Sequence, residues 1–499
     1  VKIEGDPNCP GSLGRICARG NAGLIALYDP NRLKTPVKRT NPEKGIGIDP
    51  KWEPISWDEG LNIVAEKLKE VRKDNPNGLL LCTFDTPVIA QVYLNWAAAY
   101  GTVNTMGSSY NCGSGIHPLT YLINGTFQQE IDLDYCNYAI LAGSQYGFTA
   151  GVNIPITAQK MADARMRGMK VVVIDPICTN AASKADEWIP IRPGTDGMLA
   201  LAMLNVVLNE LKTYDAEFLK KYTNAPYLVN ADGDYFRDKK TSKPMVWDVK
   251  EGKAKPFDAQ VVDCALMGEF SVDGIKCRPA FNVMAEHFKQ FTPEQAEKVT
   301  TIPAKTIRRI SKEFVEAAKI GSEIEIDGKK LPYRPAAVHA FKGVIAHAHA
   351  TISGLPFLLL NLVVGSMYVP GGYRGTNLVG PSSSWTADVE ADGMIVPPPT
   401  QSFQGENYYT HEIGSKETAD LKNMLAFSMT GTSVYQLCLM HPDRFKTMTR
   451  PCDPKMLIEA RSNLLMNCEN FADTVQFLKS IPFIVCMDTE INETSEFAD

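Results

Sequence analysis

The sequence predicts an α/β fold built on doubly wound parallel sheets. From Tyr138 onward, short apolar strands alternate with helical segments, as they do when crossover helices connect parallel strands. The segment Lys170–Asp175 carries the run Val-Val-Val-Ile, and a strand that is apolar on both faces is typical of a sheet covered on both sides. Ligands of such sheets lie at the carboxyl ends of the strands, so the loops that follow the strands are the first place to look for a site.

Length and composition narrow the protein class. The 499 residues are enough for roughly three domains. A net charge of −6 and the lack of a long basic run argue against a nucleic-acid-binding surface. The most apolar stretch, Leu355–Val369, is interrupted by proline, asparagine and glycine, and it is too short to span a membrane. The twelve cysteines contain no Cys-x-x-Cys, so we expect neither a disulfide scaffold nor a self-contained zinc or iron–sulfur site.

The elements are expected in the following order. After the turn-rich residues 1–50, the capping box Ser56-x-x-Glu59 predicts a helix through Val71. A buried strand over 78–84 and a helix over 88–100 follow. The alternating region then predicts strands over 138–143, 170–175 and 188–191, and helices over 156–167 and 196–211.

Residues 225–285 lose this alternation and are typical of an insertion, because they are rich in Lys, Asp and Gly. Thr292-Pro293 predicts the next helix start, with proline at the first helical position. A second α/β stretch begins after Pro335. It predicts helices near 351–366 and 473–479 and a last strand over 483–487.

Three successive loops at the carboxyl edge of the predicted sheet carry residues suited to a nucleotide. They offer glycine for close backbone approach, polar side chains, and a helix start whose N–H groups suit a phosphate. The residues are Gly143, Ser144 and Gln145 in the first loop, Asp175, Pro176 and Thr179 in the second, and Pro193, Gly194, Thr195 and Asp196 in the third. The same residue types also end strands and cap helices, so each loop has a purely structural alternative.

Cysteine and histidine supply the other candidates. Cys112 lies in the Gly/Ser-rich loop Asn-Cys-Gly-Ser-Gly, where a thiolate would suit a soft metal or a nucleophilic role; the alternative is a buried inert thiol. His117 could carry a proton or be a polar loop residue. His347 and His349 alternate in an apolar segment and could mimic a metal pair, although no carboxylate lies near them in the sequence.

Read together, these segments resemble the molybdopterin oxidoreductases of the dimethyl sulfoxide reductase family over essentially the whole chain. The most specific match is a single run from Ala185 to Asp196. Motifs before and after it occur in the family's order: Gly5-Asp-Pro-Asn8, Gly14-x-x-Cys17-x-Arg19-Gly20, Tyr28-Asp-Pro-x-Arg32, Trp52-x-x-Ile-Ser-Trp57, Leu141-x-Gly-Ser144, Ile174-Asp-Pro176, Leu360-Asn361, Pro370-Gly-Gly372 and Glu493-Thr-x-x-x-Ala498-Asp499.

The resemblance implies a multidomain fold with doubly wound parallel-sheet domains around a bis-pterin cofactor. Residues 1–50 would be the remainder of an N-terminal iron–sulfur domain. Residues 51–138 and 336–499 would form one discontinuous α/β domain, and 139–335 a Rossmann-like domain inserted into it. The family's C-terminal β-barrel domain is absent, so we expect the chain to be a fragment of a longer parent protein.

The resemblance also implies a molybdenum or tungsten ion held by two molybdopterin guanine dinucleotides. Cys112 falls where the family places its protein ligand to the metal. Cys17 would be the fourth cysteine of a [4Fe–4S] cluster whose other three precede Val1, and Arg19 would lie between cluster and pterin. The three sheet loops would hold one guanine dinucleotide; the residues for the other would be Asn467, Cys468, Asn470, Asp488 and Thr489. The sequence departs from the family at Gln145, where asparagine is usual, and near 467–470, where Gly-x-Asn-Pro is usual.

The activity implied is two-electron oxygen-atom transfer or hydroxylation of a small-molecule substrate. The cysteine ligand and the insertion are most similar to polysulfide, thiosulfate and arsenate reductases. Electrons would pass to or from an iron–sulfur partner subunit, with a membrane-anchor subunit beyond it. Cys112 is not followed directly by histidine, which disfavours formate. The alternatives are an aromatic acyl-CoA-oxidising relative, a non-redox hydratase or transhydroxylase, and a cofactor-free structural paralogue.

Overall fold

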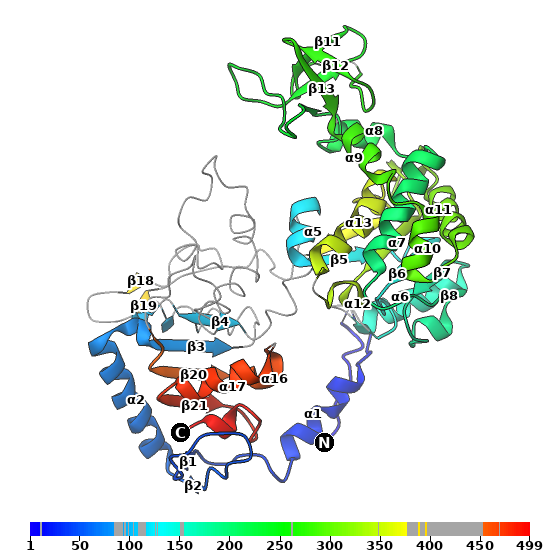
Figure 1. Ribbon diagram of the computed structural model, residues 1–499. Helices are drawn as coiled ribbons and strands as arrows, with labels where there is room; N and C mark the ends of the chain where they lie inside the picture. Colours follow the sequence, from blue (N-terminus) through cyan, green and yellow to red (C-terminus); the bar gives the residue numbers. More distant parts are fainter. Residues whose placement is uncertain are drawn as a thin grey trace. The chain divides into compact units, whose positions relative to one another are not determined.

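The computed structural model describes most of the chain. The described residues are 1–9, 12–83, 93, 96–97, 99–102, 104–107, 116–124, 126, 128–149, 154–260, 263–347, 349–376, 388–389, 395–396, 453–468 and 470–499. They divide into two compact units (Figure 1). Unit 1 comprises residues 1–4, 16–121 and 377–499, and unit 2 comprises residues 5–15 and 122–376. The predicted inserted domain, 139–335, lies within unit 2.

The secondary structure is mixed α/β, as the sequence predicts. The helices are α1 Ala18–Tyr28, α2 Trp57–Asp74, α5 His117–Asn124, α6 Ile154–Met166, α7 Asp196–Asn205, α8 Ala216–Tyr222, α9 Ala280–Phe288, α10 Pro293–Thr300, α11 Ala304–Ala318, α12 Lys342–Ile345, α13 Ala350–Val363, α16 Leu464–Asn467 and α17 Phe471–Ser480. The strands are β1 Val37–Arg39, β2 Trp52–Pro54, β3 Leu79–Thr83, β4 Thr105–Gly107, β5 Gln128–Ile131, β6 Tyr138–Ala142, β7 Lys170–Ile174, β8 Glu187–Ile189, β9 Leu228–Val229, β10 Met245–Asp248, β11 Lys253–Pro256, β12 Phe270–Val272, β13 Ile275–Pro279, β14 Glu323–Ile326, β15 Lys329–Pro332, β16 Ala336–Ala340, β17 Tyr373–Thr376, β18 Asp388–Val389, β19 Ile395–Val396, β20 Met456–Ala460 and β21 Phe483–Met487.

Unit 1 is built on a parallel four-stranded sheet in the order β21-β20-β3-β4. Strand residues alternate between its two faces, and each face is covered by helices (Figure 1). Val71 of α2 packs with Leu81 and Ile458 on one face, while Phe477 of α17 packs with Leu457 on the other. The helices on both faces explain why these strands are largely apolar.

Unit 2 holds a second parallel sheet, in the order β16-β6-β7-β8. Helix α6 packs against one face through Met161 and Ala164, and α11 and α13 cover the other. At the outer edge, Asn361 of α13 donates to Val338 O and accepts from Val338 N, both at 2.8 Å. The asparagine side chain therefore satisfies the N–H and C=O of Val338, which an uncovered edge strand would leave free to pair with another strand.

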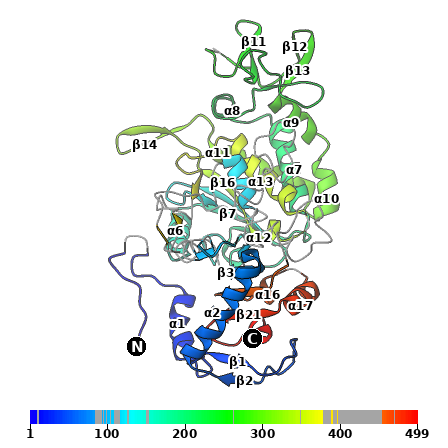
Figure 2. The same cartoon turned by 90° about the vertical axis from the view of Figure 1, so that its left-hand side faces the viewer.

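The insertion carries small antiparallel pieces instead of further sheet strands. In the part of it that the structure describes, β12, β13 and β9 form one sheet and β10 pairs with β11. The rings of Trp247 and Phe270 stack at 4.5 Å between centroids. A separate hairpin of β14 and β15 projects from the body of unit 2 (Figure 2).

Most predicted elements are confirmed within a few residues. Ser56 caps α2 by accepting from Glu59 N at 3.1 Å, and Thr292 and Gln295 form a reciprocal capping box at α10. The predicted helix over 196–211 is α7 followed by a π-helical turn over 206–210. The predicted helix over 88–100 falls mostly outside the described residues. None of the described helices combines the length and apolar character needed to cross a bilayer.

Candidate functional site

The carboxyl ends of β16, β6, β7 and β8 meet at one edge of the unit 2 sheet because the four strands are parallel. Strands β7 and β8 extend the sheet from one side of β6, and β16 adds to the other side. The chain therefore changes direction between β6 and β16. In open α/β sheets a ligand crevice lies outside such a switch point.

At this switch point the backbones of Gly143 and Gly343 touch. Gly343 N donates to Gly143 O at 2.9 Å. Gly143 has φ +50°, and a Cβ on it would lie 2.7 Å from Val344 N. A Cβ on Gly343 would lie 2.6 Å from Gly143 Cα. Only glycine fits at both positions, so the two strand ends are held at the closest approach the backbone allows.

Ser144 is engaged inside the protein. Its hydroxyl lies 2.8 Å from His339 Nδ1 and accepts from Tyr146 N at 3.2 Å. Tyr146 stacks on the His339 ring at 4.5 Å, and burial lowers the pKa of His339 to about 4, so the imidazole is neutral. The Ser144 side chain therefore fixes the loop instead of pointing out of it. Gln145 Oε1 accepts from Thr149 Oγ1 at 2.8 Å.

The second loop places a half-buried carboxyl at the end of β7. Burial raises the pKa of Asp175, and its main-chain oxygen accepts from Trp188 Nε1 at 2.9 Å. Pro176 is exposed beside it. Thr179 Oγ1 accepts from Ala182 N at 3.3 Å, so this side chain begins a short 3₁₀ turn.

The third loop turns into α7. Pro193 is exposed, Gly194 has φ +75° with open space where a Cβ would stand, and Thr195 Oγ1 donates to Arg192 O at 2.6 Å. The Thr195 side chain does not cap the helix, and the Asp196 carboxyl accepts from its own backbone N–H at the first residue of α7. Asp196 is only 3% exposed, and burial raises its pKa.

His347 belongs to the same edge, which the sequence pattern alone did not indicate. His347 lies near enough to Asp196 that a positive charge on its ring would oppose the effect of burial on the pKa of that carboxyl. His347 Nδ1 accepts from His349 N at 3.2 Å, so a neutral ring carries its proton on Nε2. That Nε2 atom is buried and has no hydrogen-bond partner among the described residues. An orphaned buried donor of this kind is available to a ligand.

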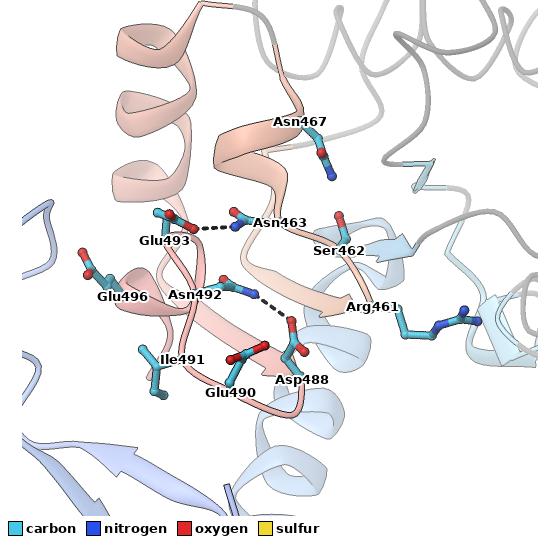
Figure 3. A pocket seen from close by; sticks show the side chains of 10 residues that line it. All are labelled: Arg461, Ser462, Asn463, Asn467, Asp488, Glu490, Ile491, Asn492, Glu493 and Glu496. Carbon is cyan, nitrogen blue, oxygen red and sulfur yellow. Dashed lines mark hydrogen bonds between the residues drawn. The ribbon is translucent and has the colours of Figure 1, made fainter. Parts of the chain in front are cut away.

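Unit 1 contains a pocket of about 710 Å³ at the carboxyl ends of β20 and β21 (Figure 3). Its lining is mostly amide and carboxylate: Arg461, Ser462, Asn463, Asn467, Asp488, Glu490, Ile491, Asn492, Glu493 and Glu496. The dashed bonds in Figure 3 join Asn463 Nδ2 to Glu493 Oε2 at 2.6 Å and Asn492 Nδ2 to Asp488 Oδ2 at 2.7 Å. The pocket is thus a hydrogen-bonding surface.

Two of the sequence candidates, Asn467 and Asp488, line this pocket, and three do not. Cys468 ends α16, and Thr489 N donates to its neighbour Asp488. Asn470 caps α17 by accepting from Asp473 N at 3.4 Å. The residues directly after β20 are Arg461, Ser462 and Asn463, which sequence reasoning missed. The available signal was the apolar run Met456-Leu-Ile, which marks the strand that they follow.

The candidate metal ligands lie in different parts of the chain. Cys112 lies outside the described residues, and of His117 only the backbone, at the start of α5, is described. Cys17 is the residue before α1, and the N–H groups of Gly20 and Arg19 lower the pKa of its thiol. Among the residues that the structure describes, no three histidine, cysteine or acidic side chains gather in a way that could hold a metal ion.

Comparison with known proteins finds relatives that are named as subunits of dehydrogenases and reductases. The chain is 31% identical to a sulfite dehydrogenase chain of Allochromatium vinosum over 403 residues, which cover 74% of this chain and 40% of that protein. It is 28% identical to the molybdopterin-containing subunit of arsenate respiratory reductase of Shewanella sp., over 74% of this chain and 38% of that protein. The chain thus spans about two fifths of the length of these relatives.

A solved structure, acetylene hydratase from Pelobacter acetylenicus, superimposes with a TM-score of 0.61 over 98% of this chain and 57% of that one, at 18% identity. This likeness supports the fold alone. The family model described as molybdopterin oxidoreductase matches residues 32–499. The chain therefore belongs to the molybdopterin oxidoreductase family.

Proposed function

We propose that the parent protein is the catalytic subunit of a molybdenum- or tungsten-dependent oxidoreductase. In this proposal each of the two parallel sheets binds one guanine dinucleotide at its carboxyl edge. The observation that carries the proposal is the presence of two such edges, one in each unit. Each edge is rich in hydrogen-bonding groups, and between them they hold most of the residues that the family motifs indicate.

The residues of unit 2 fit a dinucleotide. The N–H groups at the start of α7 suit a phosphate, and the Asp175 carboxylate can accept from ribose hydroxyls or a purine amino group. His347 Nε2 offers a buried donor that lacks a partner among the described residues. The open space where a Cβ of Gly194 would stand lets a ligand approach the backbone of the third loop. These groups would bind and orient one dinucleotide, with Ser144 supporting the first loop from inside the protein and Gln145 bonded to Thr149 at its exposed side.

The unit 1 pocket would hold the other dinucleotide. Guanine presents N–H donors on one edge, and the carboxylates of Asp488 and Glu490 are acceptors that match them. The amides of Asn463 and Asn467 can both donate and accept. Arg461 supplies a cation for a phosphate.

When bound, the pterin-held metal supplies two-electron oxygen-atom transfer or hydroxylation. In the proposal Cys112 is the protein ligand to the metal, since a thiolate suits a soft transition metal. Cys17 would bind a [4Fe–4S] cluster of the parent protein, with Arg19 as a cation beside the path of electrons. An iron–sulfur partner subunit would carry those electrons onward.

The substrate class we favour is an inorganic sulfur or arsenic species. Relatives at 28–31% identity are named for sulfite, arsenate and thiosulfate. They are also named as subunits, which supports a partner subunit here.

The test uses the full-length parent protein. Metal analysis and release of guanosine monophosphate by acid hydrolysis should give two nucleotides per molybdenum or tungsten. Turnover is then assayed with polysulfide, thiosulfate, arsenate, sulfite and phenylacetyl-CoA, with a viologen dye as electron donor or acceptor. If the purified protein contained neither molybdenum nor tungsten, the proposal would be refuted and a cofactor-free structural paralogue would be favoured. Turnover without any electron acceptor or donor would instead indicate a hydratase or transhydroxylase.

A further inference from the structure

Glu459 is a carboxylic acid buried in the middle of the unit 1 sheet. It is the fourth residue of β20, is 2% exposed, and lies in register with Cys82 of β3 and Cys486 of β21. Among the described residues it has no ion-pair partner. Because burying a carboxyl without a counter-ion costs stability, packing alone does not account for glutamate at this position.

Both carboxyl oxygens of Glu459 are hydrogen-bonded. Oε1 accepts from Leu464 N at 2.8 Å, and Oε2 accepts from Cys486 Sγ at 3.5 Å. Leu464 is the first residue of α16, immediately after the turn of residues 461–463 that lines the pocket. The carboxyl therefore holds this turn from beneath.

The other side of the same turn is held by Thr494. Its Oγ1 accepts from Leu465 N at 2.9 Å and donates to Asn463 Oδ1 at 2.9 Å. Asn463 Nδ2 donates to Glu493 at 2.6 Å. The Asn463 amide is thus held by Thr494 and by Glu493, the second of which Figure 3 shows. The turn that carries Asn463 is held by the bond from Leu464 N to Glu459.

The charge of Glu459 changes near neutral pH. Burial raises the pKa of Glu459 to about 7, and nearby Asp488 acts in the same direction. The Leu464 N–H, the Cys486 thiol and the Ser462 hydroxyl oppose this shift. The thiols of Cys82 and Cys486 have pKa values raised by burial and by Glu459, so both stay protonated. Glu459 is then the group in this cluster that titrates near neutral pH.

We propose that Glu459 is a positioning residue for the unit 1 pocket, and that its ionised carboxylate holds the 461–464 turn in the form that binds guanine nucleotide. An ionised acceptor makes a stronger hydrogen bond to a backbone N–H than a neutral one does. Protonation therefore weakens the Leu464 bond and loosens the turn. This inference rests on the proposed function, because it takes the pocket to be a nucleotide site.

The test measures binding of guanosine diphosphate to full-length protein purified without pterin, from about pH 6 to about pH 8.5. Two equivalents should bind to the wild type, and the affinity of one should rise about fivefold with pH, the difference between a neutral and a charge-assisted bond. Glu459→Gln keeps an acceptor but cannot ionise. It should hold the low-pH affinity throughout.

Two further variants sharpen the result. Glu459→Leu leaves the Leu464 N–H unsatisfied and should weaken one equivalent by a factor on the order of ten at every pH. Glu316→Gln removes an exposed carboxyl of α11 and should behave as wild type. The wild type and the variants are all tested with guanosine diphosphate, whose phosphate also titrates in this pH range. Its effect on affinity is the same for every protein, so it cancels when the dissociation constant of a variant is divided by that of the wild type.

The outcomes separate the two ideas. If wild-type protein binds no guanosine diphosphate, the proposed function fails. If it binds two equivalents and Glu459→Gln reproduces the wild-type pH profile, the nucleotide sites stand and the role of Glu459 is refuted. Thermal unfolding of Glu459→Gln at pH 6 checks that this variant is folded. The affinity of Glu459→Leu is compared with that of Glu459→Gln and is not used alone to decide the outcome.

Discussion

Substituting Gly343 with alanine should separate the ends of β6 and β16. The added Cβ would lie 2.6 Å from Gly143 Cα and 2.9 Å from Gly143 O, and both are backbone atoms that cannot rotate away. Gly343 does not need a left-handed backbone, so the whole effect is steric. Overpacking of this kind lowers the free energy of unfolding by about 1–3 kcal/mol. For a domain of this size, a loss of about 2 kcal/mol lowers Tm by about 4–8 °C.

The assay is calorimetric unfolding of the full-length protein, with Gly328→Ala as the matched control. Gly328 has φ +72° in the turn between β14 and β15, and nothing lies within 4 Å of its ideal Cβ. It therefore reports backbone strain without a clash, at about 1 kcal/mol. An unchanged Tm and unchanged nucleotide content in Gly343→Ala would refute the argument that the strand ends are in closest contact.

Three other substitutions test separate parts of the molecule. Cys112→Ala should abolish or sharply lower turnover while the pterin stays bound; wild-type turnover would remove Cys112 from the metal. Asp215→Asn leaves the buried Arg334, whose Nη2 lies 2.5 Å from Asp215 Oδ2, without its counter-charge, and should cost about 3–5 kcal/mol in denaturant unfolding. Glu459 has a folded pKa of about 7 against 4.5 unfolded, so its stabilising contribution is full below pH 4.5 and is lost as pH rises through 7. Relative to Glu459→Gln, wild-type stability should fall by about 3 kcal/mol over that window, and parallel pH curves would contradict this.

The sequence predicted the ends of β6 and β7 well because each strand contains an apolar run that is directly followed by glycine or aspartate. Gly143 and Asp175 stand directly after such runs, so their place at the edge follows from the pattern. The direction of the Ser144 hydroxyl could not be predicted, since it depends on His339 from a strand far away in the chain.

The unit 1 edge was predicted less well, and Glu459 is the reason. A buried glutamate interrupts the apolar pattern of β20, so the strand and the turn after it did not stand out. Asn470, which the sequence suggested instead, caps α17. A buried charged side chain hides a strand from pattern-based prediction, because polarity in a sequence is taken to mean exposure.

The position of β16 has a consequence for how unit 2 is made. Ser144 and His339 are 195 positions apart in the chain, yet they close the same edge of one sheet. During synthesis β6, β7 and β8 emerge long before β16. The backbone groups of β6 that later bond to β16 therefore stay unpaired with it while the whole insertion is translated. Contacts between residues so far apart in the sequence form slowly. The chain loses conformational entropy when the long loop closes, and only afterwards do the new contacts stabilise the closed form. The carboxyl edge of the unit 2 sheet is therefore among the last parts of the fold to form. Under the proposed function, a dinucleotide could bind at this edge only after β16 has docked.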